Sequence, residues 1–489
     1  MEEATYDLCH RVRGMCADAL AALRPGPFAD AVGAVAERLA GDTLVVAVGG
    51  RLNAGKSTLV NALLGQRLAP TGGTETTLVS AWFRSHHMNR VWVHFNDGRP
   101  PASVPSRVGG GVPRSIPYDH TEVSHLVVEA ANKAIGRAFT LMDTPGRDAV
   151  SALDDYSMAS IRTADALILA MPQPGEGDTA TLREFQETMR GSRLSAANVL
   201  GVLTRIDQLG QGTDLEEVRR EADKIAARSA GRMTGLVAEV VPVATKLAET
   251  ARCERLTEQH RHALGILAAA DRDTLDEMLF DHEDFLRVGL DTVPVETGMR
   301  QELLDLLAIY GIRQAVDAID CGARDLSALR DALCERSGIN RLLERLQERL
   351  VNGADALRAD AAMAALHRAV DFATAAEQQV AGRLRGLLRE LGRHPAMRRM
   401  ELAEAAQAHA AGTLPLPDRN AGQLHTLMAG VTNAQRAGLP EDASQDELRG
   451  RIGELVDEWR SLEAALPRKG RRHTTVVREV FEALYFSLL

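Results

Sequence analysis

The chain has 489 residues, of which 45% are hydrophobic and 25% charged, and its formal net charge is −10 at pH 7. This composition is typical of a globular protein of about three domains, and it disfavours both wholesale disorder and a main role in coating nucleic acid. No long, predominantly apolar stretch predicts a membrane-spanning helix.

The N-terminus and the cysteines favour a reducing, cytoplasmic compartment. Residues 1–16 contain no basic segment followed by an apolar one, as a secretory signal would. The cysteines are odd in number, scattered and never spaced C-x-x-C, which disfavours a disulfide framework and a zinc site. They are Cys9, Cys16, Cys253, Cys321 and Cys334.

Residues 1–40 predict two helices, separated at 24–27 by Arg-Pro-Gly-Pro, because proline and glycine do not continue a helix. From 41 to 250, short apolar runs alternate with helical patterns, which predicts an α/β domain with a mostly parallel sheet. The runs are 44–48, 77–84, 91–95, 124–130, 138–143, 166–171, 199–204 and 237–243. Runs 77–84 and 90–96 are close in sequence and predict an antiparallel hairpin added to the sheet, followed by a Pro/Gly-rich loop at 101–117.

A phosphate-binding motif follows the first predicted strand. Residues 49–58 read Gly-Gly-Arg-Leu-Asn-Ala-Gly-Lys-Ser-Thr and match G-x-x-x-x-G-K-[ST] between a strand and a helix. Backbone N–H groups and the helix N-terminus cradle phosphates, Lys56 neutralises their charge, and the Ser57 hydroxyl is placed to bind Mg²⁺. A tight turn alone would not explain Lys56. The predicted nucleotide contacts are Gly50, Arg51, Leu52, Asn53, Ala54, Gly55, Lys56, Ser57 and Thr58.

A glycine- and threonine-rich segment at 69–78 precedes the next strand. A loop that orders around a γ-phosphate and Mg²⁺ needs such flexibility and one threonine ligand. Thr77, directly before the strand, is the predicted Mg²⁺ ligand and Thr76 is the alternative. The non-functional interpretation is a solvated turn.

The apolar run ending at residue 143 continues into Asp-Thr-Pro-Gly, a D-x-x-G motif. We expect Asp143 to hold Mg²⁺ through a water molecule and the Gly146 N–H to meet the γ-phosphate. Position 147 is arginine rather than glutamine, so the attacking water would be held by Thr77 and the P-loop backbone. The predicted catalytic residues are therefore Lys56, Ser57, Thr77 and Gly146.

Asn53 suggests a monovalent cation, because an asparagine at this P-loop position binds potassium in some cation-activated GTPases. K⁺ or Na⁺ near Asn53 would offset developing charge. The alternative is that the amide only shapes the loop.

Two later segments predict the base specificity. Val-Leu-Thr-Arg-Ile-Asp at 202–207 is similar to the guanine-reading [NT]-K-x-D, with Arg205 in place of lysine. The Asp207 carboxylate accepts hydrogen bonds from guanine N1–H and N2–H₂, whereas adenine would leave it badly paired, so GTP is predicted. Thr204 and Arg205 complete this motif. Thr245 and Lys246, after the last strand, match a looser base-contacting signal.

Beyond residue 246 the pattern is helical to the end of the sequence. Residues 251–338 are predicted to continue the α/β domain, and 339–470 to form an elongated all-α trunk. Within the trunk, 339–391 would reach roughly 75–80 Å if unbroken. Residues 471–489 are predicted as a last helix that returns to the N-terminal helices.

Three segments combine features suited to a membrane surface. The turn 392–400 joins arginines to methionines and is predicted where the long helix reverses, 413–417 is an apolar Leu-Pro loop, and 468–472 is a basic stretch before an apolar C-terminus. For each, the simpler interpretation is structural: a basic helix end, an ordinary loop and a docked last helix.

The segments GRLNAGKSTLVNALLG, LAPTGGTETTLVSAWFR, DTPG and TRID, with the long helical half, resemble bacterial dynamin-like proteins, and most of all the isoniazid-inducible actinobacterial group. Compact ribosome-assembly and tRNA-modifying GTPases share the P-loop. However, Asp143 follows Lys56 by 87 positions, far more than those proteins use.

This resemblance implies a large GTPase that dimerises or self-assembles through its nucleotide face and remodels membrane at the inner face of the cell membrane. Its N-terminal helices would form a neck with C-terminal helices, and the trunk would reach anionic lipid. Two alternatives remain open: a soluble regulatory GTPase that binds a protein or RNA partner, and a low-activity heteromeric partner of another dynamin-like protein.

Overall fold

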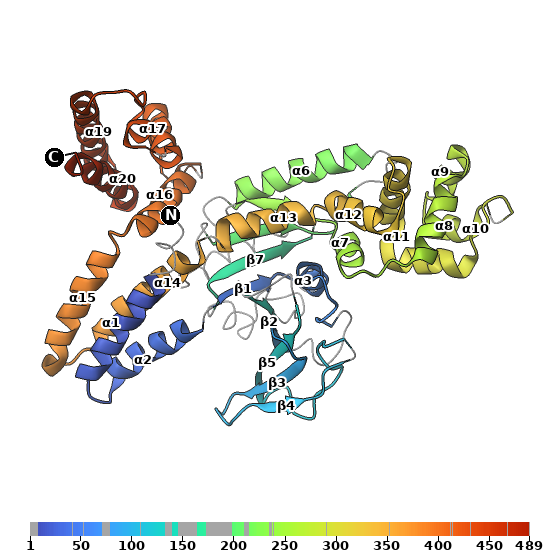
Figure 1. The fold of residues 1–489 in the computed structure, drawn as a ribbon, viewed down its shortest axis with the longest axis horizontal. Coiled ribbons are helices and arrows are strands. Elements are labelled where there is room, and N and C mark those ends of the chain that lie inside the picture. The colour runs from blue at the N-terminus through green and yellow to red at the C-terminus, as the bar shows by residue number, and fades with distance from the viewer. Residues whose placement is uncertain are drawn as a thin grey trace.

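The protein is represented by a computed structural model, and the described residues form an α/β domain followed by two groups of helices (Figure 1). They are 8–41, 43–51, 53–70, 79–107, 109–132, 139–144, 164–172, 198–209, 215–233, 237, 239–289, 291–351, 353–410, 412, 414–430, 432–466 and 468–488. Within these ranges, no helix has both the length and the apolar composition needed to cross a membrane.

The described strands form one sheet in the order β4-β3-β5-β2-β6-β1-β7-β8-β9. Strands β6, β1, β7, β8 and β9 are mutually parallel neighbours, which confirms the predicted α/β class. The bounds are β1 (Leu44–Gly49), β2 (Ser80–Ser85), β3 (Arg90–Phe95), β4 (Ala102–Val104), β5 (Val123–Ala130), β6 (Phe139–Asp143), β7 (Ala166–Met171), β8 (Val199–Leu203) and β9 (Val240–Pro242).

The sheet carries an added hairpin, but its strands are not the predicted pair. β5 lies between β2 and β3, parallel to β2 and antiparallel to β3, so the prediction that 77–84 pairs with 90–96 is wrong. The hairpin is formed by β3 and β4, and β4 lies inside the predicted 101–117 loop. β5 takes the inner position because its Leu126–Val128 run is buried on both faces, whereas short β4 suits an edge.

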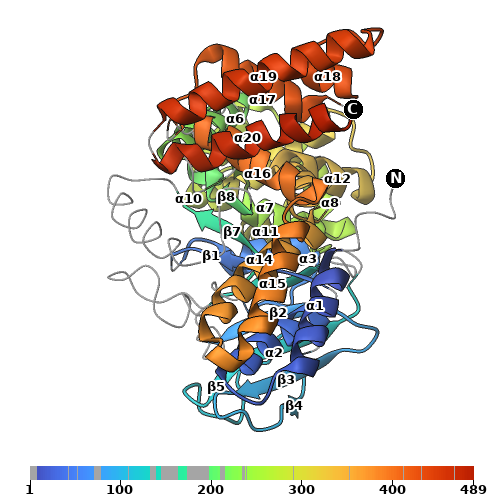
Figure 2. The ribbon, with the colours of Figure 1, turned by 90° about the vertical axis from the view of Figure 1, so that its left-hand side faces the viewer.

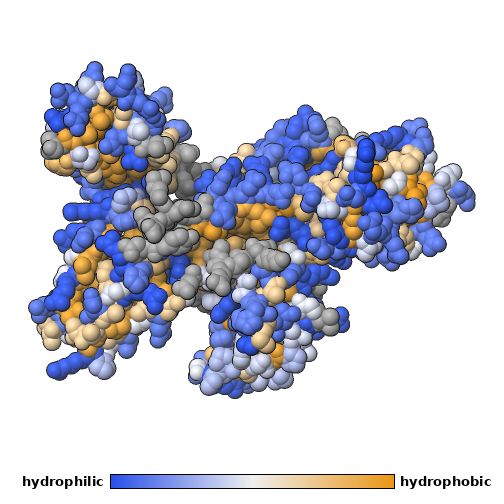
Figure 3. Space-filling view, viewed as in Figure 1, coloured by the Kyte–Doolittle hydropathy of each residue, from blue (hydrophilic) through white to orange (hydrophobic). Residues whose placement is uncertain are grey.

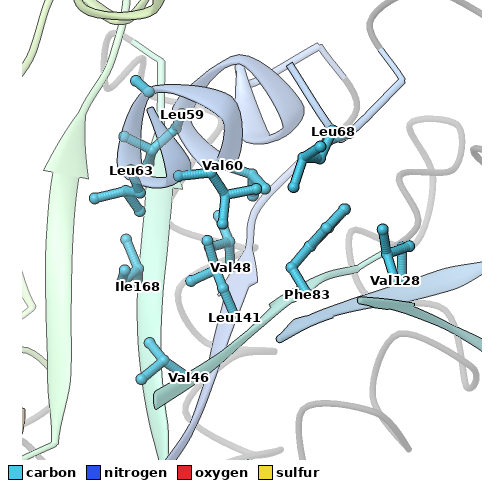
Figure 4. Close-up of a cluster of buried hydrophobic side chains, with 14 of the residues drawn as sticks. Val46, Val48, Leu59, Val60, Leu63, Leu68, Phe83, Val128, Leu141 and Ile168 are labelled. Carbon is cyan, nitrogen blue, oxygen red and sulfur yellow. The ribbon is translucent and has the colours of Figure 1, made fainter. Parts of the chain in front are cut away.

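Two apolar cores cover the two faces of the sheet. On one face, α3 (Lys56–Leu64) packs over the central strands, as Figure 4 shows. The labelled side chains in that view are Val46, Val48, Leu59, Val60, Leu63, Leu68, Phe83, Val128, Leu141 and Ile168. On the other face, α6 (Leu215–Arg232) and the helices of 245–337 form a second core with Ala47, Leu167 and Leu203. Alternate residues of β1 therefore serve opposite cores.

The helices of residues 245–346 pack against this sheet. α13 shares a core with α3 and the strands, so the trunk predicted from 339 begins one helix later. The bounds are α7 (Thr245–Arg252), α8 (Glu258–Ala268), α9 (Arg272–Met278), α10 (His282–Arg287), α11 (Thr297–Asp320), α12 (Leu326–Ser337) and α13 (Ile339–Leu346).

A first group of helices, here called the arm, leaves the α/β domain beyond α13. It joins α1 (Leu8–Ala22) and α2 (Pro27–Ala40) to α14 (Ala354–Ala369) and α15 (Gln378–Leu391) around one apolar core (Figure 2). A π-helical segment, Gln347–Val351, connects α13 to α14.

The long helix predicted over 339–391 is interrupted, and the chain reverses before 392–400 rather than there. Two short 3₁₀ turns, η4 (Val370–Phe372) and η5 (Ala375–Glu377), join α14 to α15. Thr374 and Glu377 form a capping box, because the Glu377 carboxylate accepts hydrogen bonds from the Thr374 N–H at 2.9 Å and hydroxyl at 2.7 Å. The T-x-x-E spacing, which marks the start of the next helix, was present in the sequence.

A second group of helices, here called the C-terminal lobe, follows α15. It comprises α16 (Pro395–Ala410), α17 (Asp418–Ala429), α18 (Asn433–Ala437), α19 (Gln445–Ala465) and α20 (Arg468–Phe486). Helix α20 packs on α19 and α16, not on the N-terminal helices as predicted for 471–489, because Val477 and Phe481 share a core with Trp459.

The Leu-Pro loop at 413–417 does not offer its leucines to a membrane. Leu414 and Leu416 are both buried in the core of the C-terminal lobe. Thr413 lies outside the described residues. Apolar residues in this loop therefore serve packing, as the simpler interpretation expected.

Aromatic rings stack on one face of the added strands. His125 of β5 lies between Trp82, at a ring-centroid distance of 4.8 Å, and His94, at 4.4 Å. Burial, together with the smaller effects of the nearby His94 and Arg84, lowers the pKa of His125 to about 4. The folded protein thus keeps this ring neutral at pH values where a free imidazole is protonated.

We predict that His125→Phe reduces the loss of stability in mild acid. Between pH 6.5 and about 4, the unfolded chain binds a proton at His125 that the folded chain does not. The free energy of unfolding therefore decreases as the pH is lowered through this range. Phenylalanine keeps the stacked ring and removes the titration. Urea unfolding at pH 7 and pH 5 measures the effect, and His10→Phe, at an exposed position of α1, is the control. Equal pH dependence in His125→Phe and the wild type would contradict it.

Candidate functional site

The P-loop connects β1 to α3 at the carboxyl edge of the parallel strands, where ligands of such sheets bind. Two glycines are required by its geometry. At Gly50, where φ is 146°, a Cβ atom would lie 2.3 Å from the Ala170 carbonyl oxygen, and Gly55 caps α3 in the left-handed conformation, with φ 82°. Glycine at these two positions thus lets the loop pass close to β7 and turn into α3.

Lys56 is buried and closes the loop on itself. Its Nζ donates hydrogen bonds to the carbonyl oxygens of Gly50 at 2.9 Å and Arg51 at 2.8 Å. Burial lowers the pKa of Lys56, and the nearby Asp143 carboxylate opposes this shift. The ammonium group is therefore held at the mouth of the loop, where phosphate oxygens can replace the two carbonyls.

Ser57 and Asp143 meet beside Lys56. The Ser57 hydroxyl donates to Asp143 Oδ2 at 2.8 Å, while the buried Asp143 Oδ1 has no hydrogen-bond partner among the described residues. Burial raises the pKa of Asp143 to about 6, against the opposing effects of Ser57 and Lys56. A hydroxyl next to a carboxylate with an unused oxygen fits a hydrated Mg²⁺ ion, because Mg²⁺ prefers oxygen ligands and keeps several waters.

The threonine of the base-reading segment supports the P-loop. Thr204 is fully buried, and its hydroxyl lies 2.8 Å from the Ala54 carbonyl oxygen and 3.0 Å from that of Met171. Arg205, in a left-handed conformation at φ 57°, donates from Nη2 to the Asn53 carbonyl oxygen. The segment predicted to read the base is thus tied to the loop predicted to hold the phosphates.

Asp207 lies in a 3₁₀ turn, η2 (Ile206–Gln208), directly beyond β8. Burial raises the pKa of its carboxyl, and the positive charges of Lys246 and Arg205 oppose that rise. Both predicted base-contacting segments therefore come together in the fold. Thr245, the other residue of the later segment, is buried, and its hydroxyl lies close to Gly55.

Lys246 has a structural partner that the sequence did not reveal. Helix α11 contains a non-helical residue, Ala308, with φ 54° and ψ 177°, which breaks the helical hydrogen bonds around it. The Leu304 carbonyl oxygen accepts from Lys246 Nζ at 3.1 Å, and that of Leu306 accepts from Thr250. Lys246 thus satisfies a kinked helix, while burial lowers its pKa and the negative charges of Asp305 and Asp207 oppose that shift.

Not all predicted site residues can be placed. Leu52, Thr77 and its alternative Thr76, and Gly146 lie outside the described residues. Asn53 is exposed and has a left-handed backbone, at φ 57°. The assignments that the structure brings together are those of the P-loop, Asp143, the 204–207 segment and 245–246.

A buried polar network beneath the site escaped the sequence reasoning. Asn61 of α3 brackets Ala69: its Nδ2 donates to the Ala69 carbonyl oxygen at 3.2 Å, and its Oδ1 accepts from the Ala69 N–H at 2.8 Å. The same Nδ2 lies 2.8 Å from Glu249 Oε1 on α7, and Glu249 also pairs with Arg67 and Arg255. The available signal was an asparagine among the apolar residues of α3.

This network fixes the point where the chain enters the glycine- and threonine-rich segment. Ala69 is the first residue of that segment, and Asn61 connects it to the helix that begins at Lys56. Glu249 joins both to α7, which begins at Thr245. The elements around the site are thus mutually positioned by one set of buried hydrogen bonds.

The comparisons with known proteins agree with this geometry. The dynamin family model matches residues 46–206. Isoniazid-induced protein IniC of Mycobacterium tuberculosis is 32% identical over 352 residues, which cover 70% of this chain and 69% of that protein. A bacterial dynamin-like protein of Nostoc punctiforme is 21% identical over 195 residues, or 36% of this chain and 27% of its own.

Among solved structures, a chain of an oligomerised bacterial dynamin pair, described as a mechanism for long-range sensing and tethering of membranes, aligns with this one. The alignment covers 100% of this chain and 74% of that chain, with a TM-score of 0.35 and 14% sequence identity. At this level of similarity it adds nothing to the assignment, which depends on the family model and the sequence relatives.

The chain belongs to the dynamin family, and its α/β domain is a GTPase domain that hydrolyses GTP. Within the family it is a bacterial dynamin-like protein similar to IniC, which confirms the predicted resemblance. Dynamin-family GTPases generally use Mg²⁺ with GTP, and the Ser57–Asp143 pair fits that ion.

We predict that Asn61→Ala destabilises the protein by about 3 kcal/mol, because it removes hydrogen bonds from the Ala69 backbone and from buried Glu249. Urea unfolding measures the change. Asn340→Ala removes an exposed hydrogen bond to Glu335 and is the control, with an expected effect within about 0.5 kcal/mol. Equal stabilities of the two variants would show that the network contributes little.

Proposed function

We propose that the protein is a GTP-driven mechanoenzyme that dimerises or self-assembles through its nucleotide-binding face and tethers or remodels an anionic membrane surface. The observation that supports this most directly is the hydrogen-bonded connection between the P-loop strand and the helical arm. Such a connection gives nucleotide turnover a route to movement of the helices.

The connection centres on Asp165, directly before β7. Its Oδ2 accepts the Val45 N–H of β1 at 3.0 Å, and its Oδ1 lies 3.5 Å from Arg38 Nη2 of α2. On the arm side, Arg358 of α14 donates to the Gly41 carbonyl oxygen. Strand β1 thus contacts the arm at its start and continues into the P-loop at its end, only six residues later.

In the proposed mechanism, Lys56 exchanges the Gly50 and Arg51 carbonyls for phosphate oxygens, and the P-loop backbone from Gly50 to Thr58 surrounds the phosphates. Mg²⁺, when bound, supplies positive charge that offsets the phosphates. Ser57 and Thr77 are the proposed ligands, and Asp143 holds it through water. The Gly146 N–H meets the γ-phosphate, and Thr77 with the P-loop backbone holds the attacking water.

Asp207 reads guanine in this proposal, with Thr204 and Arg205 holding its turn against the P-loop and Thr245 and Lys246 flanking the base. The geometry that favours this is the burial of Thr204 and the pairing of Arg205 with the Asn53 carbonyl. A monovalent cation near Asn53 stays a prediction. Arg205 already brings positive charge to that loop.

We predict that Lys56→Ala lowers GTP affinity by at least about 100-fold, because two charge-assisted contacts with phosphate oxygens are lost. Titration with a fluorescent GTP analogue measures the affinity. Lys224→Ala changes an exposed lysine of α6 that pairs only weakly with Glu221, and we expect it to bind as the wild type does. Survival of GTP binding in Lys56→Ala would overturn the site assignment.

A second experiment tests assembly and membrane action together. We expect GTP turnover per molecule to rise with protein concentration and to rise further with vesicles that contain an anionic phospholipid. Turnover that is independent of concentration would argue against catalysis through dimerisation. Absence of vesicle co-sedimentation both with and without GTP would reject the membrane role and favour a soluble regulatory GTPase.

A further inference from the structure

The C-terminal lobe contains a cavity of about 830 Å³ between α16, α17 and α20. This volume is within the range of sites that hold small molecules. It brings together two segments that are far apart in sequence and were separate candidates for membrane contact, the turn 392–400 and the C-terminal helix. In Figure 3 the lobe, at the upper left, exposes apolar surface among hydrophilic residues.

The cavity lining has an excess of positive charge. Four arginines line it, Arg393, Arg398, Arg399 and Arg436, against two carboxylates, Glu479 and Glu482. Both carboxylates are already paired, because Arg398 contacts Glu479, and Arg478 contacts Glu482 at 2.6 Å. The lining therefore offers uncompensated cationic charge to a ligand.

That uncompensated charge resides on Arg393, Arg399 and Arg436. Arg436 donates from Nε to the Gly430 carbonyl oxygen at 3.1 Å. Arg393 and Arg399 are exposed, and within the described ranges neither makes an ion pair. Guanidinium groups suit phosphate oxygens, since they present several donors in a planar fork.

The same cavity exposes large apolar side chains beside these arginines. Phe486 is 67% exposed and Met428 is 43% exposed, although both line the cavity between buried Leu402, Leu427 and Leu484. These two exposed groups give the rim of the cavity an apolar part next to its arginines. A ligand with an anionic head and an apolar tail satisfies both parts of the lining.

We propose that this cavity is the membrane-docking site of the protein and receives the phosphate headgroup and upper acyl chains of an anionic phospholipid in a bilayer. This proposal rests on the proposed membrane function and gives it a location. The charge complementarity with phosphate, together with the adjacent apolar side chains, favours a lipid over a purely anionic or purely apolar partner.

The test uses the full chain and vesicles of phosphatidylglycerol and phosphatidylcholine, with pure phosphatidylcholine as the neutral reference. Arg393→Gln with Arg399→Gln removes two cavity charges, and we expect about thirtyfold weaker partitioning onto the anionic vesicles. The matched control is Arg383→Gln with Arg385→Gln, which removes two exposed arginines of α15 outside the cavity. We expect this control to partition as the wild type does.

A second pair of variants tests the apolar part. Phe486→Ser is expected to weaken partitioning about tenfold, because it removes an aromatic ring from the proposed bilayer contact. Phe372→Ser, at the 57% exposed phenylalanine where the arm reverses, is the control and is expected to have no effect. Thermal melting and GTP turnover without vesicles verify that every variant is folded.

The outcomes separate the cavity from the wider membrane function. If the wild type binds anionic vesicles and the cavity variants bind equally well, the cavity proposal is wrong and the membrane function stands. If the wild type binds no vesicles in either nucleotide state, both fall. If Phe486→Ser changes the oligomeric mass in light scattering without lipid, the cavity is a contact between copies of this chain and the lipid assignment is overturned.

Discussion

The buried carboxylate of Asp165 is the interaction on which the arrangement of the GTPase domain and the arm depends. It accepts the Val45 N–H, its own backbone N–H donates to the Val45 carbonyl oxygen at 2.9 Å, and it faces Arg38 of the arm. Burial raises the pKa of this carboxyl, while Val45 and Arg38 oppose the rise. A buried charge of this kind is stable only while its partners stay in place. Asp165 therefore helps to position strand β1, and the P-loop that follows it, relative to the arm, together with the Arg358–Gly41 hydrogen bond.

The GTPase domain was largely predictable from the sequence because its signals are local. Apolar runs bounded by turns marked the strands, and the P-loop spacing identified the helix that follows β1. The pairing of β5 between β2 and β3 was not predictable, since a strand's neighbours depend on which residues can be buried on both faces. The capping box at Thr374 and Glu377 is a local signal that a longer apolar pattern obscured. The C-terminal lobe was not predictable for another reason: Phe481 meets Trp459 only through tertiary packing.

The residues of the site also divide into those that the sequence predicts and those that only the structure reveals. Lys56, Ser57 and Asp143 belong to motifs, and the fold brings them within hydrogen-bonding distance of one another or of the P-loop backbone. Asn61 and Glu249 belong to no motif and lie 188 positions apart in the chain, so only the folded structure reveals their contact. The kink at Ala308, which gives Lys246 a carbonyl to bind, is likewise invisible in a helical sequence pattern. Residues that support a site are often less visible in the sequence than those that touch the ligand.

The π-helical segment Gln347–Val351 gives the junction between GTPase domain and arm a particular kind of adjustability. A π-turn holds one more residue than an α-turn, so the residues that follow it are shifted by one position relative to a continuous α-helix. If hydrogen bonding there shifted to the α-helical pattern, the residues at the end of the segment would rotate by about 100° around the helix axis and move by about 1.5 Å along it. Leu346 on one side belongs to the core of the GTPase domain and Leu366 on the other to that of the arm. A small change in backbone hydrogen bonding at this junction would thus change the direction in which the arm leaves the GTPase domain.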